Sequence, residues 1–260
     1  MLTSLQIGQN GRLGNQMFQY AALASIAFTR GFKHALQKDD NVDLWKVFKM
    51  PNVDILDVNL LSDLKYRYSE PNFHFNANAF LVDDNTDMFG YFQSPIYFGN
   101  YFEIIKEKFT FKDEIRSTAI TRLKEHFDDR PTCSIHVRRG DYLTKSNYHP
   151  PCSIEYYTAA KQMILSATNN KAKFLLFGDD HDWIKDNLVD DISTLIEGNT
   201  PEVDMCMMSN CSAHIISNSS FSWWAAALGN YQGVVAPKAW FGPEGPQRWD
   251  TIYIHGWGLI

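Results

Sequence analysis

The sequence contains few cysteines, and none is placed like a metal ligand or a redox pair. The four cysteines form no Cys-x-x-Cys pair. Cys206 and Cys211 have no histidine nearby at the spacing of a zinc site. We therefore expect reduced thiols. The first residues, MLTSLQIGQNGRLGNQ, also lack the basic start and apolar core of a signal peptide.

Two further absences limit the class of protein. No apolar run approaches the roughly 20 residues that span a bilayer. The net charge of −6 lacks the basic excess that a nucleic-acid partner usually requires. We therefore expect a cytoplasmic protein with no transmembrane segment and no nucleic-acid partner, and association with the inner membrane surface stays open.

Short apolar strands alternate with helical patterns, most clearly in the second half of the chain. The pattern predicts strands at 132–137, 173–178, 191–197, 213–218 and 233–237, and helices at 153–168, 181–188, 201–211 and 221–229. Continuous apolar strands in such units are typical of a parallel sheet that helices cover on both faces. The sequence therefore predicts an α/β fold.

The first half is less regular. It begins with a predicted strand at 4–7, a glycine-rich turn, a helix at 15–30 that stops at Gly31, and a strand at 33–37. The region 40–110 mixes polar and aromatic residues without a sustained period, which favours irregular structure with short strands. A helix at 111–127 precedes DDRP, so we expect two halves, 1–128 and 129–260.

Ligands of an open parallel sheet bind beyond the carboxyl ends of its strands. One strand ends in SIHVRRGDY, which contains His136, Arg138, Arg139 and Asp141. Arginine offers a planar fork of donors that suits phosphate oxygens. Adjacent side chains of a strand point to opposite sides, so one arginine can face a ligand while the other holds a carboxylate such as Asp141. The alternative is a structural pair of salt bridges.

Two other strand ends carry polar groups. SNSSFSWW precedes a predicted helix, whose start attracts anions and where Ser219 and Ser220 offer hydroxyls. FGDD ends another strand with Asp179 and Asp180, which suit ribose hydroxyls or a guanine edge. Each has a plain alternative, because serine and aspartate are also ordinary helix caps.

The loop NGRLGNQ matches neither the dinucleotide-binding nor the P-loop pattern. It offers hydrogen-bond donors from Arg12, Asn15 and Gln16, or it is simply a capped turn. The sequence also lacks metalloprotease and serine-hydrolase signatures. Together these motifs indicate an anion or nucleotide site between two α/β halves, without naming a reaction.

Three stretches, GRLGNQMFQYAALA, HVRRGDY and ISNSSFSWWAAALG, together resemble motifs of the α-1,2-fucosyltransferases of glycosyltransferase family 11. The resemblance implies a GT-B-like fold of two Rossmann-like halves facing across a cleft, with the donor mainly on the C-terminal half and the acceptor on the N-terminal half. It implies an inverting transfer of L-fucose from GDP-β-L-fucose to the 2-hydroxyl of a terminal galactose. The region 32–125 matches no motif that we associate with the family.

The resemblance also implies roles for residues. Arg138 would contact the donor phosphates and His136 the nucleotide. The start of the last helix would bind phosphate, through Ser219, Ser220 and Phe221. A loop that closes over the donor would use Arg12, Asn15 and Gln16, and Asp179 or Asp180 would bind the nucleotide.

Fixed cations in place of a metal would stabilise the departing diphosphate, so the resemblance implies no metal requirement. The catalytic base stays unassigned between Asp141 and His149. Two alternatives remain: a fucosyltransferase that forms another linkage, and a carbohydrate-binding protein that uses the aromatic stretch WFGPEGPQRWD as a sugar platform.

Overall fold

The computed structural model describes residues 1–229 and 233–260. They form two compact units, which are treated separately. Unit 1 comprises Met1–Lys112 and Arg248–Ile254, and unit 2 comprises Asp113–Gln247 and His255–Ile260. The predicted division at residue 128 lies inside unit 2, because the helix Asp113–Lys124 packs with that unit.

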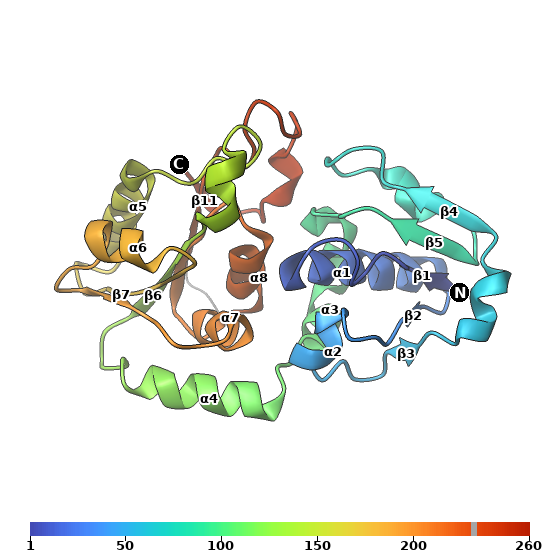
Figure 1. The fold of residues 1–260 in the computed structure, drawn as a ribbon, viewed down its shortest axis with the longest axis horizontal. Helices are drawn as coiled ribbons and strands as arrows, with labels where there is room; N and C mark the ends of the chain where they lie inside the picture. Colours follow the sequence, from blue (N-terminus) through green and yellow to red (C-terminus); the bar gives the residue numbers. More distant parts are fainter. Residues whose placement is uncertain (230–232) are drawn as a thin grey trace. The chain divides into compact units, whose positions relative to one another are not determined.

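Unit 1 is built around one long helix and two small parallel sheets (Figure 1). Its helices are α1 (Leu13–Arg30), α2 (Asp43–Val47) and α3 (Phe102–Lys108). Strands β1 (Leu2–Thr3), β5 (Thr86–Phe89) and β4 (Tyr66–Ser69) form one sheet in the order β1-β5-β4, and β2 (Ala35–Leu36) pairs with β3 (Asp54–Ile55).

The helix predicted at 15–30 is confirmed as α1, and its end has a clear cause. Gly31 adopts a left-handed conformation with φ 69°, and its N–H caps the last turn. The strand predicted at 4–7 is wrong. The strand is Leu2–Thr3, because only these residues pair with β5, whereas Ser4 donates its hydroxyl hydrogen to the carbonyl of Met88. Two short helices, α2 and α3, lie within the region predicted as irregular.

Unit 2 contains a six-stranded parallel sheet. Its strands are β6 (Thr132–Val137), β7 (Lys173–Gly178), β8 (Ser193–Leu195), β9 (Ala213–Ile215), β10 (Gly233–Ala236) and β11 (Gly258–Leu259). Its helices are α4 (Asp113–Lys124), α5 (Ile154–Ala167), α6 (His181–Asn187), α7 (Pro201–Ser209) and α8 (Ser220–Leu228). Every strand and helix predicted in the second half is therefore present, and β11 is the strand that was missed.

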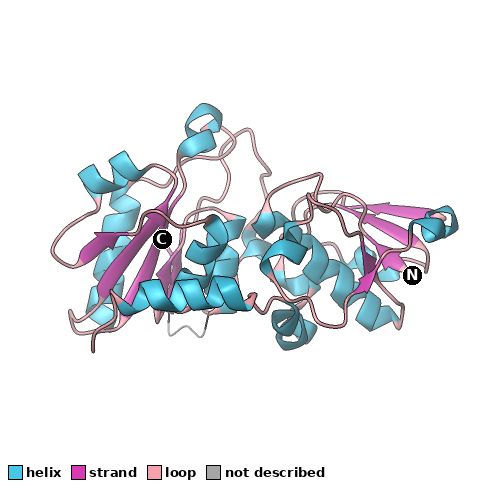
Figure 2. Cartoon of the chain, turned by 60° about the horizontal axis from the view of Figure 1, so that its bottom comes forward, coloured by secondary structure: helices cyan, strands magenta, loops and turns pink. Residues whose placement is uncertain are grey.

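The strand order is β11-β10-β9-β6-β7-β8, and all pairings are parallel. This is the order of a doubly wound Rossmann-like sheet, whose chain turns back at the pair β6–β9. Helices α5 and α6 lie on one face, and α4, α7 and α8 lie on the other (Figures 1 and 2). The core on the first face includes Ile135, Tyr157 and Ile164.

The described residues also contain six short 3₁₀ helices: Val58–Asp63, Ala77–Leu81, Pro95–Tyr97, Gly99–Tyr101, Gly140–Lys145 and Asp250–Ile252. All four cysteines are buried free thiols, as predicted. No helix in the described part of the chain combines the length and apolar character that a membrane span requires.

Candidate functional site

The site in unit 2 lies where the strand order reverses. Strands β6 and β9 are neighbours, with Ile135 opposite Ile215, but their chains lead to opposite sides of the sheet. The carboxyl ends of these two strands are the place where open α/β sheets bind ligands. The loop that follows β6 contains the arginine pair, and the segment that follows β9 leads directly into α8.

His136 joins these two segments. Its Nδ1 lies 2.9 Å from Oγ of Ser217, and its ring is 5.3 Å from that of Phe221 between centroids. Burial lowers the pKa of His136 to about 4. The imidazole is therefore neutral at neutral pH and serves as a hydrogen-bonding group rather than as a cation.

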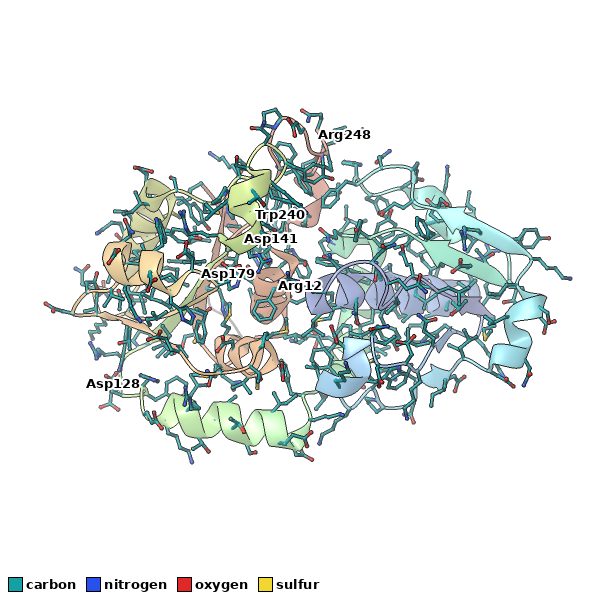
Figure 3. All side chains as sticks on the ribbon, viewed as in Figure 1. Arg12, Asp128, Asp141, Asp179, Trp240 and Arg248 are labelled. Carbon is teal, nitrogen blue, oxygen red and sulfur yellow. The ribbon has the colours of Figure 1, made fainter. Side chains whose placement is uncertain are left out.

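Both arginines are bound to carboxylates. Arg138 forms ion pairs with Asp141 and, at 2.6 Å, with Asp179. Arg139 donates from Nε to Asp180 at 3.0 Å, and its guanidinium lies 4.3 Å from the centroid of the Trp183 ring. The prediction that one arginine holds a carboxylate while the other faces a ligand is met only in part: Arg138 holds Asp141, but Arg139 holds a carboxylate too, as in the alternative of a structural pair of salt bridges. Figure 3 labels Asp141 and Asp179 at the same end of the unit 2 strands.

The FGDD carboxylates support the arginine loop. Asp179 accepts hydrogen bonds from the N–H groups of Arg139 and Gly140, at 2.8 and 3.2 Å. Asp180 also caps α6, because its Oδ1 accepts from the N–H of Trp183. Asp179 thus fixes the backbone beside Arg138 as well as pairing with its side chain.

The segment between β9 and α8 is tightly held. Ser219 is the N-cap of α8, and its hydroxyl accepts from the N–H of Phe221 at 3.3 Å. Asn218 donates to the carbonyls of Pro150 and Trp240, both at 3.0 Å. The start of α8, with Ser220 as its first residue, is therefore held in place after β9, and its dipole favours an anion there.

Sequence reasoning missed the role of Tyr142. Its hydroxyl donates to the carbonyl of Asn218, its ring lies 5.4 Å from the Arg138 guanidinium, and it stacks on His149 at 4.7 Å between ring centroids. Tyr142 thus connects the two segments around Arg138. Burial lowers the pKa of His149, whose buried Nδ1 has no hydrogen-bond partner among the described residues.

The glycine loop belongs to unit 1. Arg12 is exposed at the start of α1 (Figure 3), whereas Gln16 is almost fully buried. The Gln16 amide donates to the carbonyl of Asn41 and accepts from the N–H of Asp43, at 3.0 and 2.8 Å. Asn15 accepts from the Gln93 amide at 2.7 Å. Gln16 therefore ties α1 to α2 within the unit.

The prediction that the stretch WFGPEGPQRWD forms an aromatic sugar platform is wrong in part. Trp240 and Phe241 are buried, and Phe241 packs against Tyr148 and His149. These two rings therefore offer no exposed face for a sugar. Among residues 1–229 and 233–260, no group of three or more His, Cys, Asp and Glu side chains could hold a metal ion.

The fold resembles that of solved fucosyltransferases. A crystal structure of NodZ alpha-1,6-fucosyltransferase soaked with GDP-fucose matches with a TM-score of 0.57 at 14% identity, covering 88% of this chain and 92% of that chain. The GT-B-like α/β fold predicted from the sequence is thereby confirmed.

The family follows from the sequence. The model described as Glycosyl transferase family 11 matches residues 2–260, and the chain belongs to this family. Alpha-1,2-colitosyltransferase of Escherichia coli is 32% identical over 93% of this chain and 96% of its own length. Galactoside alpha-(1,2)-fucosyltransferase 1 of Homo sapiens is 27% identical over 84% of this chain and 64% of that protein. The chain is a glycosyltransferase of the fucosyltransferase family.

Proposed function

We propose that this protein transfers L-fucose from GDP-β-L-fucose to the 2-hydroxyl of a terminal galactose, with inversion at the anomeric carbon. The observation that carries the proposal is the position of Arg138, directly after the central strand β6 and beside Tyr142, whose hydroxyl binds the carbonyl of Asn218 ahead of α8. Family membership and the α-1,2 linkage named for two relatives support the linkage.

Charge counting shows what donor binding requires. Arg138 and Arg139 contribute two positive charges, and three carboxylates (Asp141, Asp179 and Asp180) contribute three negative ones, so the cluster has a net charge of −1. We infer that a diphosphate displaces one carboxylate from Arg138, because the excess negative charge opposes its binding. Asp141 is the one to be displaced, because its side chain is 45% exposed whereas that of Asp179 is 29% exposed and accepts two backbone N–H groups.

In the proposed reaction the galactose oxygen attacks the fucose anomeric carbon as its bond to the β-phosphate oxygen breaks. Negative charge grows on GDP, where Arg138 and the positive end of the α8 dipole stabilise it. We propose that Ser219, Ser220 and Phe221 place this helix start against the phosphates. His136 and Asp179 bind the nucleotide part of the donor in this proposal, and Arg12 and Asn15 bind the donor from the glycine loop.

The galactose hydroxyl loses a proton during the attack, and two groups near Arg138 can accept it. Asp141 becomes available when the diphosphate displaces it from Arg138. His149 is neutral and stacks on Tyr142. Gln16 acts in the proposed site only by holding the start of α1, because its amide is committed to Asn41 and Asp43.

A second donor has specific support. The relative at 32% identity is a colitosyltransferase, and colitose is L-fucose without its 3-hydroxyl. A site that hydrogen-bonds the 3-hydroxyl rejects the deoxy sugar strongly, whereas a site without such a bond discriminates little. Comparing kcat/KM for GDP-fucose and GDP-colitose therefore decides between the two donors.

The test is to incubate the protein with GDP-fucose and lactose in EDTA and to identify the product by mass and linkage-resolved NMR. We expect 2-linked fucosyl-lactose, formed without a divalent metal because fixed donors take its place. A product linked at another position would replace the proposed linkage. Glycan binding without donor turnover would support a carbohydrate-binding protein instead, and loss of turnover in EDTA that Mg²⁺ restores would contradict metal independence.

A further inference from the structure

A strained segment of unit 1 follows strand β5. We call Gly90–Gln93 the post-β5 segment. Phe92 adopts φ 51°, a left-handed conformation that a bulky residue rarely takes. Gly90 has φ 157°, and a Cβ atom at this position would overlap the side chain of Glu70. Such backbone persists only where its surroundings hold it.

Glu70 is the group that holds the post-β5 segment. Its Oε2 accepts hydrogen bonds from the N–H groups of Tyr91 and Phe92, both at 2.9 Å. Its Oε1 accepts from the hydroxyl of Tyr97 at 3.3 Å. Glu70 directly follows β4, which pairs with β5, so one carboxylate fixes the ends of two neighbouring strands.

The post-β5 segment in turn holds both ends of residues 6–15, which include most of the glycine loop. The Gln6 amide donates to the carbonyl of Gly90. The Gln93 amide donates to Asn15 Oδ1 at 2.7 Å, and the Asn15 side chain packs directly over Gly11. Residues 6–15 are therefore attached at their two ends to a segment of only four residues.

We propose that Glu70 is a positioning residue that acts through the post-β5 segment to set residues 6–15, which include most of the glycine loop. Its carboxylate orders Tyr91 and Phe92, and this places the carbonyl of Gly90 and the amide of Gln93 where the loop is attached. The step from an ordered loop to tighter donor binding rests on the proposed function, in which this loop contacts the donor.

Glu70 also makes the loop sensitive to pH. Burial raises its pKa to about 7, while the N–H groups of Phe92 and Tyr91 and the hydroxyl of Tyr97 favour the charged form. The titratable groups that face it are the phenols of Tyr68 and Tyr97, whose pKa values burial raises further. Below pH 7 the neutral acid accepts weaker hydrogen bonds while the carboxyl group stays buried, so the local hold on the segment loosens although the same protonation favours the folded state as a whole.

The first test needs no substrate. Hydrogen exchange of residues 6–16 is measured for wild type, Glu70→Ala, Glu70→Gln and Glu103→Gln, which removes an exposed carboxylate of α3 from the same unit. We expect roughly tenfold faster exchange in Glu70→Ala, a smaller increase in Glu70→Gln and no change in Glu103→Gln. Unchanged loop exchange in a folded Glu70→Ala or Glu70→Gln protein would overturn the proposal.

The second test separates positioning from general damage. In Glu70→Gln we expect the KM for GDP-fucose to rise severalfold at pH 8 and to lose its pH dependence near 7, while the KM for lactose stays unchanged. Gln93→Ala should raise the donor KM similarly, and the double variant should be no worse than the single ones. Additive effects, or equal changes in both KM values, would overturn the proposal.

Different results would contradict the proposed function and the proposed role of Glu70. A wild-type protein that turns over neither GDP-fucose nor GDP-colitose and does not bind GDP contradicts the proposed function. Loop exchange in the Glu70 variants still decides whether Glu70 positions the loop.

Discussion

Nδ1 of His136 lies 2.9 Å from Oγ of Ser217, so one hydrogen bond joins the ends of the two central strands β6 and β9. This bond crosses the point where the strand order reverses. It fixes the arginine loop relative to the start of α8 inside a single unit. The residues that unit 2 contributes to the proposed donor site can therefore be tested one at a time.

Replacing Arg138 should weaken donor binding strongly. We expect Arg138→Ala to weaken GDP binding by about 2–4 kcal/mol, roughly 30-fold or more, because a bound diphosphate loses its paired cation. Isothermal titration with GDP measures this change. Arg130→Ala is the matched control, since Arg130 pairs with Asp128 on the surface and should leave binding unchanged. Equal affinities for GDP in the two variants would remove Arg138 from the site.

Asp141→Asn should separate two roles of that carboxylate. The change removes the negative charge that competes with phosphate for Arg138, so we expect GDP to bind about 3- to 10-fold more tightly at low salt. If Asp141 is also the base, kcat falls while GDP binds better. If kcat is retained, His149 becomes the candidate. Weaker GDP binding would show that Asp141 orients Arg138 rather than competing with the ligand.

Ionisation of Glu70 should lower the free energy of unfolding as pH rises. Its folded pKa of about 7 exceeds the ordinary value of 4.5, so the folded state holds the proton more tightly. Stability is then fully present below pH 4.5 and is lost toward pH 7, by about 3 kcal/mol at most. Urea unfolding from pH 4.5 to 8 measures this slope. Glu70→Gln should remove it, and a slope that persists in this variant would assign it to another group.

The buried rings of His136 and His214 should have the opposite effect, so that the free energy of unfolding falls as pH drops. Burial lowers the pKa of His136 to about 4 and that of His214 to about 3. The unfolded chain therefore binds protons that the folded one excludes, and the free energy of unfolding should fall as pH drops from 6.5 toward 4, by up to about 1.4 kcal/mol per pH unit for each group. NMR titration of the ring protons checks the cause: titration of either ring near pH 6.5 would contradict it.

Gly11→Ala and Gly31→Ala form a matched pair in the left-handed region. Gly31 has φ 69° and open space around its Cα, so alanine there should cost only about 1 kcal/mol of conformational strain. Gly11 has φ 86°, and a Cβ atom would overlap the Asn15 side chain. We expect Gly11→Ala to raise the donor KM and Gly31→Ala to leave it unchanged. Thermal unfolding and donor kinetics distinguish the two, and equal donor KM values would exclude a packing role for Gly11.

Much of unit 2 could be predicted from sequence, because its strands are continuous apolar runs and its helices have local start and stop signals. Thr132–Val137 and Lys173–Gly178 match the predicted strands residue for residue, and Ser153, the first residue of the helix predicted at 153–168, is the N-cap of α5. Unit 1 was harder to predict. Its strands have only two to four residues, too few to show a period, and depend on pairing with distant partners.

The sequence by itself determined the α/β class, the family and the residues that follow each strand, since these depend on local patterns and motifs. Only the tertiary structure decided what those residues contact. It placed β6 beside β9, gave Arg138 two carboxylates, buried the amide of Gln16, and brought Glu70 to the backbone of Tyr91 and Phe92. Such contacts join positions far apart in the chain, and the local periodicity of the sequence does not predict them.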